Sequence, residues 1–345
     1  MLRLTSQGRS PSVERALTDF GIEDSFGRAS KRFKEHYGWD IGRTTVLRVT
    51  EQRAHEAERY VAERLQEVRK AFNTSVSERP GVKELLVELD GCEIRTGTLM
   101  PAVVDEKSDP SEPRKRKRLE EWRDIRVGLT RPLDEVTPTF VAAMAEYSVV
   151  TEQLFSAAVD RGLSEKTQVV GVADGGIGLR EALDAKFSGM RFILDRPHFK
   201  SHLYETADAV GLDSVFREEW VHAAVVECEK GNAAVVVKSL NDYEGAGAAR
   251  THCLAKYLDR FKDAVDYEKA RESGYPTGSG EVESAHRYIP QKRLKIAGAC
   301  WSPSTINPML ALRVLRENEW WEDFWAAEAP HSSWTTENTR QRPAA

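Results

Sequence analysis

Two aspartates follow short apolar runs that have the length of buried strands. Asp90 comes after residues 85–89, and Asp174 comes after residues 168–173. In open α/β sheets, ligands bind beyond the carboxyl ends of the strands, so the two carboxylates converge if these strands are parallel neighbours. Hard divalent cations prefer carboxylate oxygens, and a pair of them about 3.5–4 Å apart neutralises the charge that develops during phosphodiester cleavage. The two aspartates therefore predict a site for Mg²⁺ or Mn²⁺.

A third acid follows a glycine-rich loop at 274–280, where Glu281 and Glu283 open a predicted helix. Residues two apart point to different faces of a helix, so only one of the two glutamates can face the metals. Each acid also has a structural interpretation. Asp-Gly after a strand is an ordinary turn, and glutamates favour the positive end of a helix. The residues alone leave the choice between the two glutamates open.

Asp195 ends another apolar run, at 191–194, and is therefore an alternative to Asp174 as a metal ligand. His198 and His202 are four residues apart and share one face of a helix, a spacing that also occurs in zinc sites. No cysteine or further histidine lies near them in the sequence. We therefore favour a hydrogen bond between Asp195 and His198 that supports the metal ligands.

Basic residues gather in two places. The segment 286–295 has no acid and is expected to neutralise DNA phosphates, with an affinity that falls steeply with salt. Its basic residues are Arg287, Lys292, Arg293 and Lys295. The run RKRKR at 114–118 is equally well explained as a solvated surface.

The composition is that of a globular protein of two or three domains, with 345 residues and 40% hydrophobic content. The net charge of −5 argues mildly against a protein that only coats DNA. No run approaches the ~18 apolar residues of a membrane span, and the N-terminus has no secretory apolar core. The four cysteines are scattered and are expected to be reduced. These features predict a soluble cytoplasmic protein.

The periodicity of apolar residues predicts an N-terminal helical region followed by an α/β core. Residues 1–75 are helical, and a break near Gly38 makes a helix-turn-helix possible, with 43–53 entering a DNA groove. A plain helical hairpin is the alternative. In 76–200 the order is βββαβαβ, a mixed five-stranded sheet. The expected strands are 85–89, 93–99, 122–130, 168–173 and 191–194, with a helix over 140–157.

The rest of the chain is expected to form an insertion followed by the last part of the core. Residues 201–272 are expected to form a helical insertion, and 273–326 the last part of the core, which carries the candidate glutamate. Residues 327–345 have the composition of a disordered tail.

Four segments resemble a known family, the bacterial insertion-sequence transposases of the DDE class, in the ISKra-type group related to the Mutator-like transposases. They are LVELDG at 86–91, GVADGGIGLREAL at 171–183, FILDRPHFKSHLYE at 192–205 and GYPTGSGEVESAHRYIPQKRLKIAGACW at 274–301. The resemblance covers about residues 15–325. It implies that the catalytic triad is Asp90, Asp174 and Glu283, rather than Glu281. It places a C/D-x-x-H signature on Asp195 and His198.

The resemblance further implies an RNase H-like (retroviral integrase-like) fold with two Mg²⁺ or Mn²⁺ ions. Such an enzyme cleaves the 3′ ends of its element and transfers the 3′-OH into target DNA. Its partners are double-stranded DNA, as terminal inverted repeats and target, and further copies of itself in a synaptic complex. It would be cytoplasmic and nucleoid-associated when bound to DNA. Two alternatives stay open: an RNase H-like nuclease without strand transfer, and a catalytically silent transposase-derived DNA-binding protein.

Overall fold

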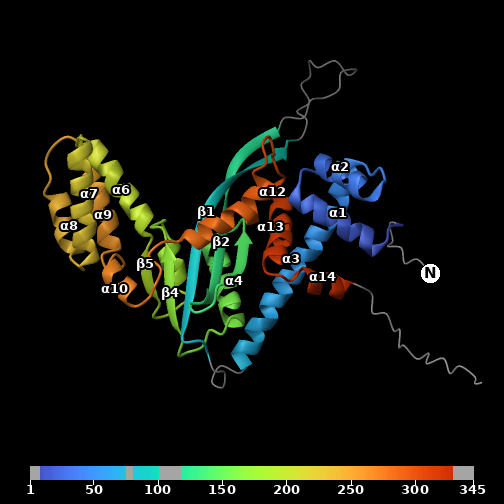
Figure 1. The fold of residues 1–345 in the computed structure, drawn as a ribbon, viewed down its shortest axis with the longest axis horizontal. Helices are drawn as coiled ribbons and strands as arrows, with labels where there is room; N and C mark the ends of the chain where they lie inside the picture. Colours follow the sequence, from blue (N-terminus) through green and yellow to red (C-terminus); the bar gives the residue numbers. More distant parts are fainter. Residues whose placement is uncertain (1–7, 75–80, 101–117, 329–345) are drawn as a thin grey trace, which may run out of the picture.

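A five-stranded mixed sheet forms the centre of the protein (Figure 1). The computed structural model describes residues 8–74, 81–100 and 118–328. The strand order is β3-β2-β1-β4-β5, and only β2 runs antiparallel to the others. The strands are β1 (Glu84–Leu99), β2 (Arg118–Pro132), β3 (Thr139–Ala143), β4 (Gln168–Ala173) and β5 (Arg191–Leu194). The predicted α/β class and mixed sheet are confirmed.

The first strand is longer than the sequence analysis predicted. β1 continues past Asp90 to Leu99, and it pairs along its whole length with β2, from Leu85 opposite Pro132 to Leu99 opposite Arg118. The prediction of a separate hairpin strand at 93–99 is therefore wrong. The polar residues after Asp90 belong to the part of β1 that extends past β4, where the uniformly buried run ends and exposed residues alternate with more buried ones.

The third strand was predicted as the start of a helix. Residues 139–143 form β3, and helix α4 (Tyr147–Asp160) begins only afterwards. The side chain of Asn318 provides hydrogen bonds to the backbone at the outer edge of β3. It accepts from the N–H of Phe140 at 2.8 Å and donates to the carbonyl of Phe140 at 2.9 Å. The order βββαβαβ is thus correct, although two of its strands were misplaced.

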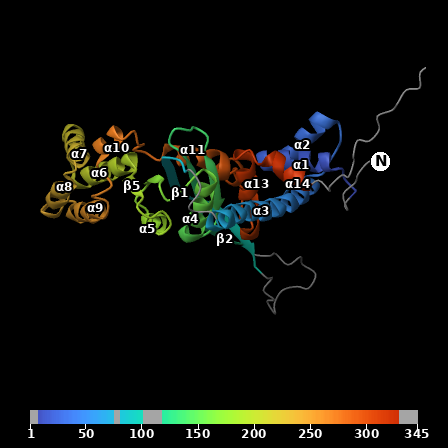
Figure 2. The same ribbon diagram turned by 90° about the horizontal axis from the view of Figure 1, so that it is seen from below.

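Helices cover both faces of the sheet, with α4 and α11 (Gly280–His286) on opposite sides (Figure 2). A π-helical turn, Arg287–Gln291, joins α11 to the short α12 (Lys292–Leu294). Helix α13 (Pro303–Glu317) packs against β3 and the N-terminal region. The described chain ends with α14 (Trp321–Glu328), so the predicted tail falls outside the described residues from 329 onward.

The N-terminal region has a small core of its own. Its helices are α1 (Pro11–Glu23), α2 (Phe26–Tyr37) and α3 (Arg43–Thr74), and the core consists of Leu17, Ala29, Phe33, Val46 and Val49. Gly38 ends α2 with φ 73°, a left-handed conformation that favours glycine. In the segment 43–53, Arg43 and Arg48 are exposed, whereas Arg53 pairs with the buried Glu14. Within 43–53, the exposed arginines therefore lie in the first turns of α3.

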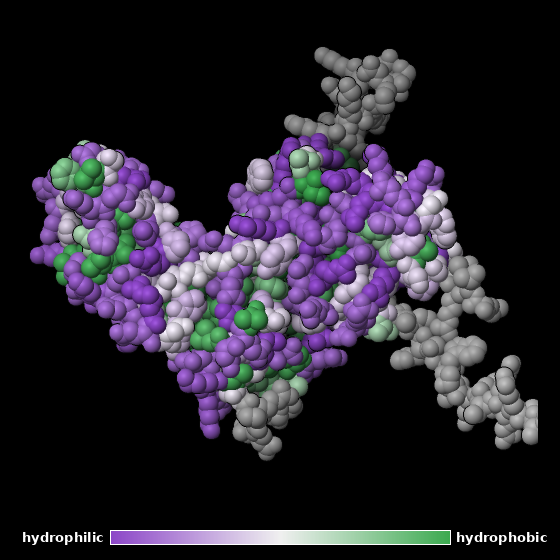
Figure 3. All heavy atoms as spheres, viewed as in Figure 1, coloured by the Kyte–Doolittle hydropathy of each residue, from purple (hydrophilic) through white to green (hydrophobic). Residues whose placement is uncertain are grey.

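A helical lobe is inserted after β5 and lies beyond that edge of the sheet (Figure 1). It contains α6 (Arg196–Val210), α7 (Ser214–Glu229), α8 (Ala233–Asn241), α9 (Ala248–Arg260) and α10 (Tyr267–Glu272). A notch separates this lobe from the rest of the molecule (Figure 3). Across the described parts of the chain, no helix combines the length and apolarity that crossing a membrane requires.

Candidate metal centre

The sheet brings three aspartates to one edge. The β1–β4 ladder ends at Glu88 opposite Val172, so two residues further on Asp90 lies opposite Asp174. The β4–β5 ladder ends at Ala173 opposite Leu194, and the next pair in register is Asp174 and Asp195. The prediction that Asp90 ends its strand is wrong, because β1 continues to Leu99. Asp90 lies just beyond the last residue of β1 that pairs with β4. Three neighbouring parallel strands thus carry a carboxylate at the same level.

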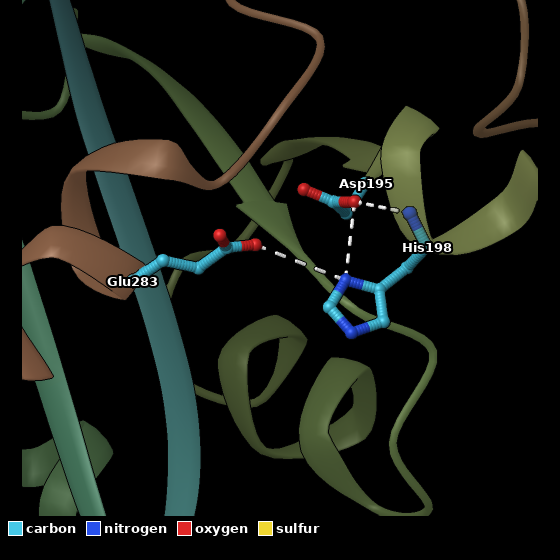
Figure 4. A group of neighbouring side chains, drawn as sticks. All are labelled: Asp195, His198 and Glu283. Atoms are coloured by element: carbon cyan, nitrogen blue, oxygen red, sulfur yellow. Dashed lines mark hydrogen bonds and ion pairs between the residues drawn. The ribbon is translucent and has the colours of Figure 1, made fainter. Parts of the chain in front are cut away.

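Glu283 reaches this edge from helix α11. Its Oε1 lies 3.9 Å from Nδ1 of His198, and Oδ1 of Asp195 lies 3.2 Å from the same nitrogen (Figure 4). The ligand atoms of the three residues lie within 4.8 Å of one another, so the group could hold a metal ion. Asp195 was predicted as an alternative ligand and His198 as a supporting residue. Both therefore lie beside the predicted ligand Glu283.

Arg131 separates the roles of the two glutamates on α11. Arg131 lies on β2, and its Nε donates to Oε2 of Glu281 at 2.9 Å. Glu281 therefore links α11 to β2, whereas Glu283 points to His198 and Asp195. The geometry agrees with the expectation that only one of the two faces this site.

Asp195 has both carboxylate oxygens engaged by the protein. Oδ1 accepts from the backbone N–H of His198 at 2.6 Å, so Asp195 caps α6, and Pro197 fits the first turn of that helix. Oδ2 accepts from the N–H and the hydroxyl of Ser279, at 2.7 and 2.8 Å. Burial opposes ionisation, but these bonds with His198 and Ser279 outweigh it and lower the pKa of Asp195 to about 2. This carboxylate ties β5, α6 and the start of α11 together.

Asp90 and Asp174 have fewer partners. Oδ1 of Asp90 accepts from the N–H of Gly91 at 2.7 Å, and Oδ1 of Asp174 accepts from the N–H of Gly176 at 2.9 Å. Burial raises the pKa of Asp90 to about 6, and the charge of Asp174 adds to the increase. Like charges gathered at a buried edge are the arrangement that a bound cation stabilises.

His198 is the positive charge beside these acids. Its hydrogen bond to Asp195 is the main reason that its pKa rises to about 9; burial opposes the shift, and the charges of Asp195, Asp174 and Asp90 support it. His202 lies elsewhere, with Nδ1 3.3 Å from Arg250. Within the described residues His202 joins no metal-capable group with His198, so their spacing does not produce a shared site.

Glu88 was missed by the sequence analysis. Its side chain is fully buried, and Oε2 accepts from the N–H of Val282 at 2.8 Å, which fixes α11 to β1 directly beside Glu283. Oε1 has no hydrogen-bond partner among the described residues. The signal was present, because a charged residue interrupts the apolar run two positions before Asp90 and so lies on the same face of the strand.

Replacing Glu88 with glutamine is expected to stabilise the protein in alkaline solution. Burial raises the pKa of Glu88 from 4.5 to about 8, with help from the nearby charge of Glu281. Between these values the folded chain keeps a proton that the unfolded chain releases. The free energy of unfolding therefore falls as pH rises, by at most about 1.4 kcal/mol per pH unit. Glutamine does not titrate and still accepts from Val282.

The measurement is urea unfolding of wild type and Glu88→Gln at pH 5, 7 and 9. The variant should be closest to wild type at pH 5, exceed it by a growing margin up to about pH 8, and exceed it by a constant margin above that value. Glu93→Gln, an exposed change on the same strand, is the control and should leave the wild-type pH profile in place. Parallel profiles for Glu88→Gln and wild type would show that Glu88 is not a protonated acid in the fold.

The basic residues of 286–295 do not form one surface strip. Arg287 and Lys295 are exposed, Lys292 is exposed but paired with Glu23, and Arg293 is only 2% exposed. Residues 114–117 lie outside the described residues, and Arg118 is exposed at the start of β2. Arg287 and Lys295 are the members that a nucleic acid can reach directly.

Comparison of the chain with models of known protein families and with curated protein sequences finds no match in either. The resemblance to DDE transposases is therefore a proposal. What supports a function is the geometry of this edge of the sheet: three aspartates in register, a glutamate from α11 and a histidine between them.

Proposed function

We propose that this protein is a DDE-type DNA transposase, with an RNase H-like core in which Asp90, Asp174 and Glu283 bind two Mg²⁺ or Mn²⁺ ions. The observation that carries the proposal is that Asp90 and Asp174 lie in register on adjacent parallel strands, while Glu283 from α11 has its ligand atom within 4.8 Å of that of Asp195, the next aspartate along this edge. The strand order β3-β2-β1-β4-β5, with only β2 reversed, supports the fold that the resemblance implies. Oxygen-rich ligands fit hard divalent cations better than zinc.

Two such ions, when bound, would activate water and then the 3′-OH, and would stabilise the leaving oxygen. The residues of the chain supply the positions. Asp90 and Asp174 offer carboxylates from the adjacent parallel strands β1 and β4, and Glu283 offers a third carboxylate from helix α11. His198 contacts Asp195 and lies near Glu283, where its positive charge offsets the acids around it. Asp195 acts as a positioning residue, because its oxygens hold α6 and α11 in place.

A notch in the molecular surface lies beside the site. Strand β5, helix α6 and helix α11 meet near the base of the notch between the helical insertion and the core (Figures 1 and 3). Arg287 and Lys295 follow α11 and would contact phosphates beside the scissile bond, with strong salt dependence. Terminal-repeat recognition by the N-terminal helices and a homo-oligomeric synaptic complex belong to the same proposal.

The test uses a linear duplex that contains the DNA flanking the gene, incubated with protein, Mg²⁺ and a supercoiled target plasmid. The proposal predicts nicking at a defined 3′ end, followed by joining of that end to the plasmid. A nuclease without strand transfer would nick and never join. A silent DNA-binding derivative would bind the duplex, and Asp90→Asn would then change nothing. Inverted repeats and a short target duplication around the gene would independently support mobility.

A further inference from the structure

A second candidate site lies beyond α12, where the chain passes the N-terminal helices. A pocket of about 670 Å³ opens there between α2, α3, the start of β2 and residues 293–305. Pockets of about 300–1,000 Å³ are typical of sites that bind small molecules of nucleotide size. None of the residues that surround this pocket belongs to the candidate metal centre.

Three helices begin at this pocket. Ser25 caps the 12-residue α2, Arg43 is the first residue of the 32-residue α3, and Ser302 stands at the N-cap position of the 15-residue α13 without a side-chain cap bond. All three residues line the pocket. The first N–H groups of a helix have no partner inside the helix and carry a partial positive charge, so helix N-termini attract anions. Three of them around one pocket produce a local positive field.

Arg293 is an independent sign that an anion belongs here. The residue lines the pocket and is 2% exposed, with its guanidinium 4.4 Å from the ring of Phe26 and 4.6 Å from that of Trp301. Nε donates to the carbonyl of Gly21 at 2.7 Å, but Nη2 has no hydrogen-bond partner among the described residues. The charges of Asp24 and Glu51 favour the charged guanidinium, but neither carboxylate accepts a hydrogen bond from Nη2, and a buried donor without an acceptor is costly. An anion in the pocket would supply the missing acceptor.

Two exposed arginines complete the lining. Arg43 and Arg118 form no ion pair with any described residue, and their side chains are free to turn toward a ligand. Glu51 is the single acid among the described residues around the pocket. With Arg293 the balance is three arginines to one glutamate, which favours an anionic ligand. Leu47 and Ile296 add apolar surface suited to a base or sugar.

We propose that this pocket binds the phosphate of an unpaired deoxynucleotide at a DNA end. Its volume admits one nucleotide and not a duplex, so the base must lie outside the double helix. Anion binding follows from the arginines and helix ends alone. The choice of DNA as the source of the phosphate rests on the proposed function.

The experiment measures fluorescence polarisation in EDTA, so that binding is observed without cleavage. Wild type should bind a labelled duplex with a three-nucleotide single-stranded end about tenfold more tightly than the blunt duplex of the same sequence, a difference that a few phosphate contacts provide. Arg43→Ala combined with Arg118→Ala should abolish that preference and reduce the salt dependence for the overhang duplex. Lys238→Ala, an exposed change on α8 in the helical insertion and outside the pocket, should leave the ratio of the two affinities unchanged.

Competition identifies the source of the phosphate. A deoxynucleoside monophosphate should displace the overhang at lower concentration than inorganic phosphate. Equal competition by the two would overturn the nucleotide assignment and leave a plain anion site. A wild-type protein without overhang preference, or a double variant that keeps it, would overturn the proposal. Overhang binding in EDTA by a protein that never cleaves DNA in Mg²⁺ would support the pocket and contradict the transposase function.

Discussion

Replacing Glu283 with glutamine is expected to abolish Mg²⁺-dependent cleavage of an end-containing duplex, with a loss of at least about 10³-fold, or about 4 kcal/mol of barrier. The amide keeps the shape of the side chain but removes the charge that binds a cation. The fold should persist, because Glu283 is about half exposed and its nearest charged neighbour, His198, is 3.9 Å away. Cleavage assays and thermal unfolding, each with and without Mg²⁺, measure both effects.

The matched control is Glu281→Gln on the same helix. That change weakens the contact with Arg131 and should cost about 1 kcal/mol of stability or less, as partly exposed ion pairs do. Cleavage should stay within about tenfold of wild type, since a loss of about 1 kcal/mol is less than tenfold in rate. The assignment on α11 would be reversed if Glu281→Gln abolished cleavage while Glu283→Gln left it intact.

Local patterns predicted much of the fold. The apolar runs at 168–173 and 191–194 became β4 and β5, the N-terminal periodicity became three helices, and 201–272 contains only helices and turns. Failures occurred where distant residues decide the structure. β3 pairs with β2 and has its outer edge bonded by Asn318, 178 residues after Phe140, and the continuation of β1 depends on pairing with β2. No window of neighbouring residues contains either partner.

The acidic residues of the candidate site could be predicted from the sequence, but the hydrogen bonds that hold them in position could not. Two aspartates and Glu283 could be selected because strand ends and helix starts gather at one edge of an α/β sheet. The shared role of Ser279 and Asp195 was hidden, because the residues are 84 apart in the sequence and helices α6–α10 lie between them in the chain. The buried position of Arg293 was hidden as well, since a basic run without acids is typical of a surface.

The variants Asp174→Asn and Asp195→Asn should change the stability of the metal-free protein differently, and this difference shows which of the two aspartates is a metal ligand. Asp174→Asn removes a negative charge beside Asp90, so the metal-free protein should become as stable as wild type or more stable. It should also lose the stabilisation by Mg²⁺, about 2.7 kcal/mol at 100 times the dissociation constant. Asp195→Asn cannot accept all the bonds from Ser279 and His198, so the metal-free protein should lose about 2–4 kcal/mol.

Thermal unfolding over a series of Mg²⁺ concentrations separates these outcomes, and cysteine variants in Mn²⁺ provide a second test. Asp174→Cys should be inactive in Mg²⁺ and partly active in Mn²⁺, because a thiolate is a poor ligand for the harder Mg²⁺. Asp195→Cys should be inactive in both, since a sulfur atom cannot replace a carboxylate that bridges α6 and α11. If instead Asp195→Asn alone removes the response to Mg²⁺, the ion is held by Asp195, His198 and Glu283, the group whose ligand atoms already lie within 4.8 Å of one another.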